Sequence, residues 1–278
     1  MKINNLKFTL LRLGALTALL FVAACGGSPE ATADAEAESG VGAGGASAEG
    51  EATAVAEAGV SGLCANAYYP VLEGASHSYV AAGGPGGDFA FTTTVSAVRE
   101  DGFTLTTESG DVTVTQEWAC TEEGLVALTY GGGAAGAISV SGSEATYETS
   151  DVTGVTLPAS IAIGDTWSQT FNITGTQTIP GMEEAATVDG SASASYEAIG
   201  EESVETEAGT FTALKVAVTN TIDLTVNVSG ISSASLFTST GRIWYVAGIG
   251  WVKSVDSVEI AGGAFETSID LSVYSLPE

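Results

Sequence analysis

Hydrophobic and polar residues alternate with a period of two along most of the chain after residue 63. The pattern is clearest in four runs, 89–95, 112–120, 222–228 and 265–273, where most of the residues at every second position are apolar or aromatic. Successive side chains of a β-strand point to opposite faces of a sheet, so this period is typical of half-buried strands. The four runs therefore predict strands with one face in a core and the other in solvent.

Short turns separate the predicted strands. The turn signals are the Gly83-Gly84-Pro85-Gly86-Gly87-Asp88 run, Asp101-Gly102, Ser109-Gly110-Asp111, Ala208-Gly209 and Gly262-Gly263. Valine and threonine, which favour strands, are frequent, and no long stretch has a helical period. Half-buried strands joined by short turns form antiparallel sheets with one polar face. The predicted fold class is all-β, as an antiparallel β-sandwich or a half-open β-barrel.

Two short patterns occur twice, in the same order along the chain. The first is W-x5-G-[LW]-V, which starts at Trp118 and again at Trp244. The second is a proline followed by G-x-x-aromatic or histidine, in Pro70, Gly74 and His77 and in Pro158, Gly164 and Trp167. Two related halves, at about 66–130 and 157–258, explain the recurrence. Chance is the alternative, because the separations between the paired motifs differ.

The first 24 residues have the anatomy of a secretory signal peptide. Lys2, Lys7 and Arg12 precede an apolar stretch, 13–24, which is too short to span a hydrocarbon core of about 30 Å. The stretch ends in Val22-Ala23-Ala24-Cys25, which resembles the lipobox of bacterial lipoproteins. The resemblance implies cleavage after residue 24 and lipidation of Cys25. An ordinary signal peptide followed by a chance cysteine is the alternative.

The lipobox resemblance also implies a location for the protein. Two or more acyl chains anchor a protein stably in a membrane, whereas one holds it only marginally. Residue 26 is glycine, not the aspartate that retains enterobacterial lipoproteins in the inner membrane. We therefore expect an exported, membrane-anchored protein at the outer membrane or the cell surface.

The segment that follows Cys25 is predicted to be a disordered tether. Residues 26–62 are mostly alanine, glycine, glutamate, serine and threonine, so they cannot bury enough apolar surface to offset the loss of chain entropy. A flexible coil of this length spans about 35 Å from end to end. The domain organisation is thus a signal peptide at 1–24, a lipidated cysteine and linker at 25–62, and a β domain at 63–278.

The charge of the exported chain excludes several classes of partner. After Cys25 only Arg99, Lys215, Arg242 and Lys253 are basic, against 34 acidic residues, which gives a net charge of −30. Binding to nucleic acid or to anionic lipid head groups needs clustered lysine and arginine, so neither is expected. The acidic residues come as scattered pairs without the spacing of a calcium loop. They indicate a heavily solvated surface, and we expect no cofactor.

Two cysteines and one histidine remain as candidates for special chemistry. Cys64 and Cys120 are an even pair in an oxidising compartment, which favours a disulfide; two separate buried thiols are the alternative. His77 is the only histidine, and no C-x2-C pattern accompanies it, so a zinc site is not expected. Adjacent strand residues point to opposite faces, so Ser76 and Ser78 cannot share a face with His77. We interpret His77 as an ordinary strand residue, with no catalytic residue assigned.

Most of 66–258 resembles a family of bacterial envelope proteins related to the TapB-like group. The shared features are a proline–glycine–aromatic opening, an A-G-T-F hairpin and a W-Y-A-P-G-x-G-x-V-K ending. Here they read 70–79, 208–211 and 244–253, and the ending lacks the proline and has Trp251 in place of an aliphatic residue. These motifs are turn and core residues, so the resemblance implies a fold and no established activity.

Two functions remain open from the sequence. The leading hypothesis is a non-enzymatic lipoprotein whose β domain binds an apolar or glycan ligand or acts as a scaffold. The alternative is a carboxylate-based glycan hydrolase of the cell envelope. We expect the large aromatic residues to be core residues first and sugar-stacking residues second: Trp118, Trp167, Trp244, Trp251 and Tyr68-Tyr69. A turn at Gly248 and Gly250 should carry Trp244 and Trp251 into different strands.

Overall fold

The computed structural model describes residues 62–83, 87–129, 145–178, 184–260 and 263–277. These residues form thirteen strands in a single sheet, and the assigned elements include no helix. The all-β prediction is therefore confirmed, and the half-open barrel is correct rather than the two-sheet sandwich. Cys25 and nearly all of the linker lie outside the described residues, so their predicted roles stay predictions.

The strands differ greatly in length. Those of the first part are β1 (Ser76–Ala82), β2 (Phe89–Arg99), β3 (Gly102–Ser109), β4 (Val112–Cys120), β5 (Gly124–Ala127), β6 (Ala145–Gly154) and β7 (Leu157–Pro158). Those of the second part are β8 (Thr166–Gln177), β9 (Ala186–Thr206), β10 (Gly209–Val228), β11 (Ile231–Val246), β12 (Gly250–Ile260) and β13 (Gly263–Ser275). All four strands predicted from the alternating runs are present, as parts of β2, β4, β10 and β13.

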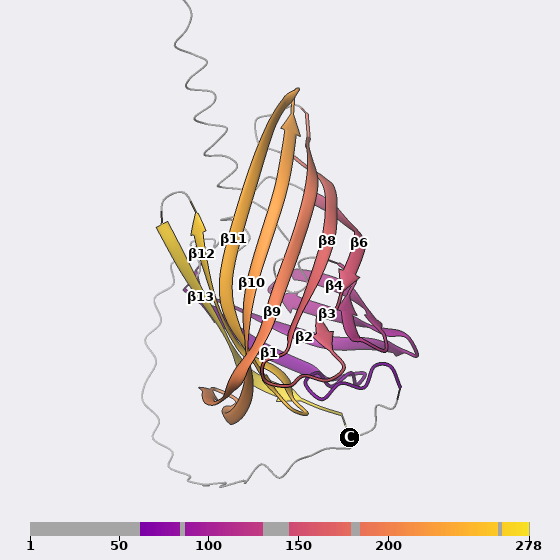
Figure 1. Cartoon of the computed structure of the whole chain (residues 1–278), viewed down its shortest axis with the longest axis vertical. Helices are drawn as coiled ribbons and strands as arrows, with labels where there is room; N and C mark the ends of the chain where they lie inside the picture. Colours follow the sequence, from indigo (N-terminus) through magenta and orange to yellow (C-terminus); the bar gives the residue numbers. More distant parts are fainter. Residues whose placement is uncertain (1–61, 84–86, 130–144, 179–183, 261–262, 278) are drawn as a thin grey trace, which may run out of the picture.

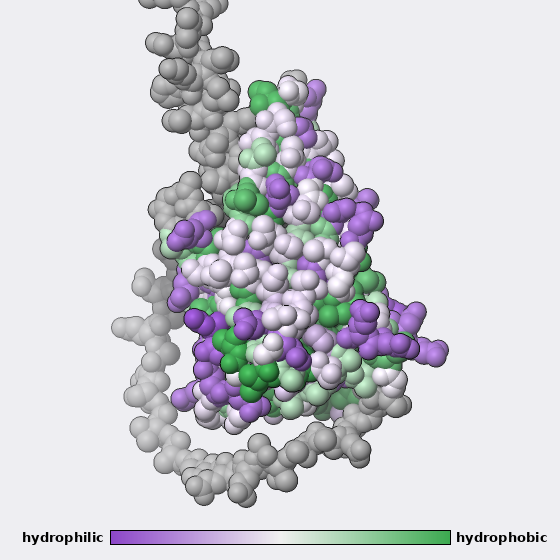
Figure 2. All heavy atoms as spheres, in the orientation of Figure 1, coloured by the Kyte–Doolittle hydropathy of each residue, from purple (hydrophilic) through white to green (hydrophobic). Residues whose placement is uncertain are grey.

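The sheet consists of two meanders that are joined through the first and last strands. Strands β1 to β5 pair in chain order, as do β8 to β13, and β13 pairs antiparallel with β1. In Figure 1, β8 to β11 form a tall curved wall, and β2 to β4 run across its base. The outward face of this wall carries hydroxyl side chains in register, such as Thr170, Ser193, Thr221 and Thr238, and it is correspondingly pale in Figure 2.

The two edges of the sheet are held together at one place. Strands β6 and β7 are the edge strands, and only residues 155–156 separate them in the chain. The Thr156 N–H donates to Leu125 O of β5 (2.9 Å), and the Gln169 side chain of β8 donates to Ala127 O (2.9 Å). Gln169 also accepts from the Thr156 hydroxyl (2.7 Å). Because Gln169 is almost fully buried, these bonds close the barrel locally and leave it open elsewhere.

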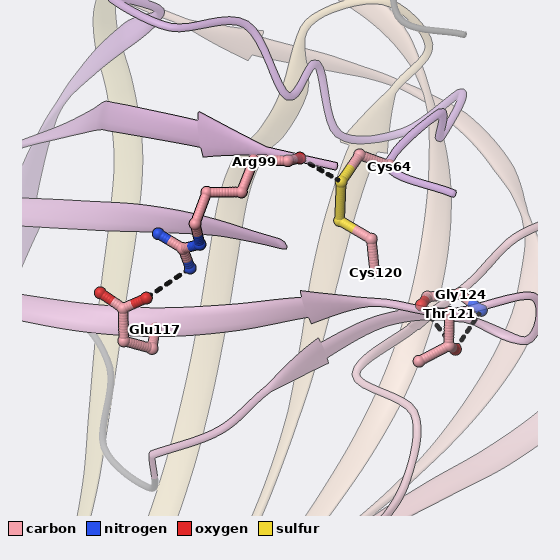
Figure 3. The surroundings of a disulfide bond; sticks show 6 residues. All are labelled: Cys64, Arg99, Glu117, Cys120, Thr121 and Gly124. Carbon is pink, nitrogen blue, oxygen red and sulfur yellow. Dashed lines mark hydrogen bonds and ion pairs between the residues drawn. A yellow bond between two sulfur atoms is a disulfide. The ribbon is translucent and has the colours of Figure 1, made fainter. Parts of the chain in front are cut away.

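A disulfide ties the start of the domain to the end of β4. Cys64 and Cys120 are bonded, at a sequence separation of 56, and Figure 3 shows the bond bridging the segment before β1 and the strand that also carries Glu117. Both cysteines belong to a core with Phe103, Trp118 and Leu125. A cross-link over a loop of this length contributes roughly 2–4 kcal/mol.

The two sequence patterns occupy equivalent places in the two meanders. Trp118 and Trp244 each lie near the end of one strand, and Gly124 and Gly250 each open the next strand with a positive φ. Pro158, which leads into the second half, pairs with Gly124 of the first. Conversely, the first half's Pro70 approaches the second half's Gly250, where it lies 3.4 Å from the position of an added Cβ. A proline segment of each half therefore packs on the glycine that opens a strand in the other half.

The predicted turn between Trp244 and Trp251 is also present. Strand β11 ends at Val246 and β12 begins at Gly250, and Gly248 and Gly250 both have positive φ, which glycine adopts without strain. The Gly248 N–H donates to Ala67 O (2.8 Å), so the turn is fixed to the segment that precedes β1. None of the described residues forms a helix long and apolar enough to cross a membrane.

Candidate functional site: the concave face of the sheet

The inward face of β8 to β13 is the best candidate site because it combines apolar walls with unpaired polar groups. One cross-strand row on this face contains Tyr196, Val218, Gly241, Asp256 and Thr267, from β9 to β13 in order. Directly paired residues of antiparallel strands point to the same side of a sheet. Val218 is buried, whereas the next residue, Thr219, is exposed, which identifies this row as the inward one.

An apolar wall lies on one side of this row, along the upper parts of β8, β9 and β10. Its buried members form one cluster: Phe171, Ile173, Ala186, Val188, Ala192, Leu224, Val226 and Val228. The alternation of β10 produces this wall directly, since Leu224, Val226 and Val228 are buried and the intervening Thr225 and Asn227 are less so. The wall is therefore an apolar core on the inward side of these strands.

Asp256 is an unpaired carboxyl within this inward face. It makes no hydrogen bond or ion pair with the described residues, and burial raises its pKa to about 6. Burial also raises the pKa of Tyr196 to about 12, with a further contribution from the charge of Asp256. A raised carboxyl pKa without a compensating partner is a feature of functional sites more often than of structural ones.

Gly241 makes room for the Asp256 carboxyl. A Cβ atom at residue 241 would collide with Asp256 Oδ1 and with the backbone oxygen of Val255. Glycine inside a strand is unfavourable and marks a place where another group approaches closely. Two residues further along β10 and two residues back along β11, the Asn220 side-chain amide donates to the Ser239 hydroxyl (3.3 Å). Asp256, Asn220 and Ser239 thus form a polar belt below the apolar wall.

Aromatic side chains also gather in a second core, which β1, β2 and β12 share with Trp244. The Trp251 ring stacks on Tyr79 with 4.3 Å between centroids, and Tyr79 stacks on Phe91 at 5.1 Å. The Tyr79 hydroxyl donates to Trp251 O (3.0 Å). The Trp251 indole N–H is buried and has no hydrogen-bond partner among the described residues. A buried donor without an acceptor is rare in native proteins and calls for an explanation.

His77 is bonded to the turn that follows β11. Its Nε2–H donates to Ile249 O (2.7 Å), which fixes the turn between β11 and β12, and burial lowers the pKa of His77. Ser78 lies on the opposite face and bonds to Thr92 (2.8 Å). The ring packs between Tyr79 and Tyr274.

The large aromatic residues lie mainly in cores. Trp118 and Trp244 are buried, whereas Trp167, Trp251, Tyr68 and Tyr69 are partly buried against core clusters. Trp167 stacks on Tyr196 at 5.3 Å and donates from its indole to Thr156 O (3.1 Å). The expectation that these are core residues first is therefore confirmed.

Trp244 also belongs to an ionic cluster at the margin of this core. Its indole N–H donates to Glu202 Oε1 (2.7 Å), and Lys215 Nζ binds Glu202 Oε2 (2.9 Å). The ammonium group also lies 5.4 Å from the centre of the Trp244 ring. These hydrogen bonds lower the pKa of Glu202. Glu202 was missed from the sequence because nothing local to residue 202 marks its contact with Trp244, 42 residues away.

The glycan hydrolase hypothesis needs two carboxyls that face each other across a cleft. The neighbours of Asp256 on the two adjacent strands are Gly241 and Thr267, neither of which is acidic. Two open hollows have volumes of about 490 and 290 Å³: one lies beside Glu122 and Glu123, and the other is lined by Arg242 together with Val218 and Gly241 of the Asp256 row. The described residues bring no three histidine, cysteine or acidic side chains together in a metal-binding group.

No protein-family model and no curated protein sequence matches the chain. Solved structures with a similar arrangement include a protein from Bacteroides fragilis described as exported and as having a YmcC-like fold. It is 13% identical, with 76% of this chain and 100% of that chain covered, at a TM-score of 0.46. The TapB-like resemblance thus stays a prediction.

Two further structures show a weaker similarity. A protein from Parabacteroides distasonis described as a lipoprotein is 14% identical over 76% of this chain and 99% of that chain, at a TM-score of 0.42. The hypothetical lipoprotein YmcC from Escherichia coli is 10% identical over 73% and 86%, at 0.31. The similar structures are thus described as exported proteins or lipoproteins.

Proposed function

We propose that this chain is a membrane-anchored extracytoplasmic lipoprotein whose half-open β-barrel binds a ligand with an apolar body on its concave face. The observation that carries this proposal is the inward position of Asp256, a carboxyl that has no partner among the described residues and whose pKa burial raises. A shell that served only as a scaffold would gain stability from an apolar residue there, because an unpaired buried charge is costly.

The apolar wall supports an apolar body for the ligand. Ligand sites in proteins are concave and mostly apolar, with a few polar groups that fix orientation. The inward side of β10 has this composition, with Ile222, Leu224, Val226 and Val228 above the Asn220 amide. Polar groups on the ligand can then satisfy hydrogen bonds that the protein leaves unmade.

Native mass spectrometry of the protein purified from its own envelope, after removal of the acyl chains, tests this proposal. We expect a co-purifying small molecule on the wild-type chain. The inward variant Leu224→Asn should lose it, while the outward Thr225→Asn should retain it, because the two side chains are on opposite faces of β10. Circular dichroism shows whether Leu224→Asn is folded. Equal ligand occupancy in both folded variants, or a wild-type chain without ligand, contradicts the proposal.

The anchor is expected to depend on Cys25. Replacing it in Cys25→Ser removes the thiol that the lipobox resemblance assigns to lipidation, so the protein should move from the membrane fraction to the soluble fraction on fractionation. Ala24→Ser is a control that keeps the thiol. Unchanged membrane partition of Cys25→Ser would remove the lipid anchor from the proposed function.

A further inference from the structure

The upper part of β11 has a free edge. Strand β12 accompanies β11 only from Ser239 to Val246, so residues 231–236 pair with β10 alone among the described residues. Figure 1 shows β10 and β11 rising beyond the end of β12. A strand that is paired on one side only leaves the N–H and C=O groups of every second residue open on the other side. A free edge of this length, about 20 Å, can accept one further strand.

The sequence of this edge lacks the features by which proteins protect free strand edges, which are charged side chains, proline and bulges. No charged residue occurs between Asp223 and Arg242, in a chain with 34 acidic residues, and residues 231–236 include no proline. The register of β11 with β10 is regular throughout, so no bulge turns the edge away. The β11 edge is therefore open to the addition of a strand.

The two terminal edges of the sheet, by contrast, are protected. Strand β6 carries Glu148 and Asp151, and its register with β8 is irregular around Asp151, which has a positive φ. Strand β7 has only two residues and ends in Pro158. Protection at both terminal edges makes the unprotected β11 edge a distinct feature of this sheet, and not a general property of its strands.

Leu236 lies on the outward face of the same edge. Its side chain is 68% exposed, the largest exposed fraction among the large hydrophobic residues that the structure describes. It pairs with Asp223 of β10, and none of the described strands pairs with it on the other side. Directly opposed side chains on neighbouring strands lie about 5 Å apart. A strand added to this edge would therefore cover part of the Leu236 side chain.

We propose that a second copy of this chain occupies the β11 edge, so that the two β11 strands pair antiparallel across a two-fold axis and join the two sheets. A two-fold contact uses the same residues of both copies. A register centred on Ala234 places Ser233 opposite the partner's Ser235 and Ser232 opposite the partner's Leu236, with no charge in the contact. This inference concerns the edge of the sheet and is independent of the ligand of the concave face.

Charge favours self-pairing at this edge over the other edges of the sheet. Two copies paired through β6 would bring Glu148 and Asp151 of one copy close to the same acids of the other. Like charges opposite each other destabilise a strand pair. The β11 edge avoids this repulsion, because its uncharged stretch lies between Asp223 and Arg242.

Sedimentation velocity of the exported chain with Cys25→Ser tests the proposal, in about 0.15 M salt to screen the repulsion between two acidic copies. We expect a dimer whose fraction rises with protein concentration. Ala234→Lys and Ala234→Asp each place two like charges opposite each other, so each variant alone should be monomeric. An equal mixture of the two should restore the dimer, because opposite charges then face each other.

The matched control is Thr225, which pairs with Ala234 and lies on the same face of β10. Thr225→Lys adds the same charge one strand further from the axis and should leave the dimer intact. Circular dichroism shows whether each variant is folded. A wild-type chain that is monomeric at every concentration would overturn the second copy as the occupant of this edge, and so would a dimer that persists in folded Ala234→Lys.

Disulfide trapping tests the register. Directly opposed residues of antiparallel strands have Cα atoms about 4.5–5.5 Å apart, within the reach of a disulfide, so Ala234→Cys should give a covalent dimer on oxidation. In Thr225→Cys the two Cα atoms would be about 14 Å apart, and no cross-link should form. Equal cross-linking of both variants, or open-ended aggregates in place of a dimer, would overturn the two-fold pairing, because this pairing leaves no further edge for addition.

Discussion

Trp244→Ala is expected to lower the free energy of unfolding by about 3–5 kcal/mol, the range found when a large buried aromatic side chain is truncated. The Trp244 side chain is buried in a cluster with Val204, Ala213 and Leu271, which come from three different strands. The variant loses this packing and leaves Glu202 without its indole donor. For a domain of this size the loss corresponds to a fall in melting temperature of about 6–20 °C.

Thermal unfolding of three variants separates packing from surface chemistry. Trp244→Phe keeps a ring in the cluster but cannot donate to Glu202, so its melting temperature should lie between those of the wild type and Trp244→Ala. Tyr147→Ala is the surface control, because the Tyr147 side chain is exposed. A Trp244→Ala protein that melts within a degree or two of the wild type would show that Trp244 is not a core residue.

Asp256→Asn is expected to stabilise the protein at pH 7–8 and to have little effect near pH 4. Burial raises the pKa of Asp256 from 3.8 to about 6 in the folded chain, so between these values the folded state binds more protons than the unfolded state. Stability therefore falls as the pH rises through this window. A shift of this size corresponds to a loss of about 3 kcal/mol above pH 6, which the neutral asparagine avoids.

Urea unfolding at pH 4, 5, 6 and 7.5 measures this effect. The difference in unfolding free energy between Asp256→Asn and the wild type should grow across the window and then level off. Asp223→Asn, at an exposed position, should show no such dependence. A constant difference at all four pH values would mean that Asp256 does not titrate as a buried, unpaired carboxyl.

The strands could be predicted from the sequence because the residues that mark them are close together in the chain. The alternation of 222–228 and the glycines around residue 249 depend on neighbouring residues, and both were placed correctly. The sequence could not distinguish a half-open barrel from a sandwich. The half-open barrel depends on the pairing of β13 with β1 and on the Gln169 bonds to Ala127 and Thr156. Residues so far apart in the chain leave no local sequence pattern that predicts their contacts.

Asp256 was missed for a different reason. In the run 254–258, Val255 points outward whereas Val258 pairs with the inward Ser239, so hydrophobicity does not decide which face of β12 is inward. Only the register with Gly241 shows that the carboxyl faces the apolar side. A glycine inside a strand was the available signal, but glycine is too frequent in this chain to single out residue 241.

Pro70 of the first half packs on the β11–β12 turn of the second, and Pro158 of the second half packs on the β4–β5 turn of the first. These reciprocal contacts also constrain the order in which the protein can fold. The segment around Ala67 and Pro70 contacts the turn at Gly248, which is synthesised much later. Strand β1 likewise has only β2 as a pairing partner until β13 has been synthesised. Contacts this distant in sequence make folding slow, in the range of milliseconds to seconds, and leave strand edges exposed meanwhile. The first half therefore emerges unfinished, and a chain shortened before β13 should persist as an aggregation-prone intermediate rather than as a smaller folded domain.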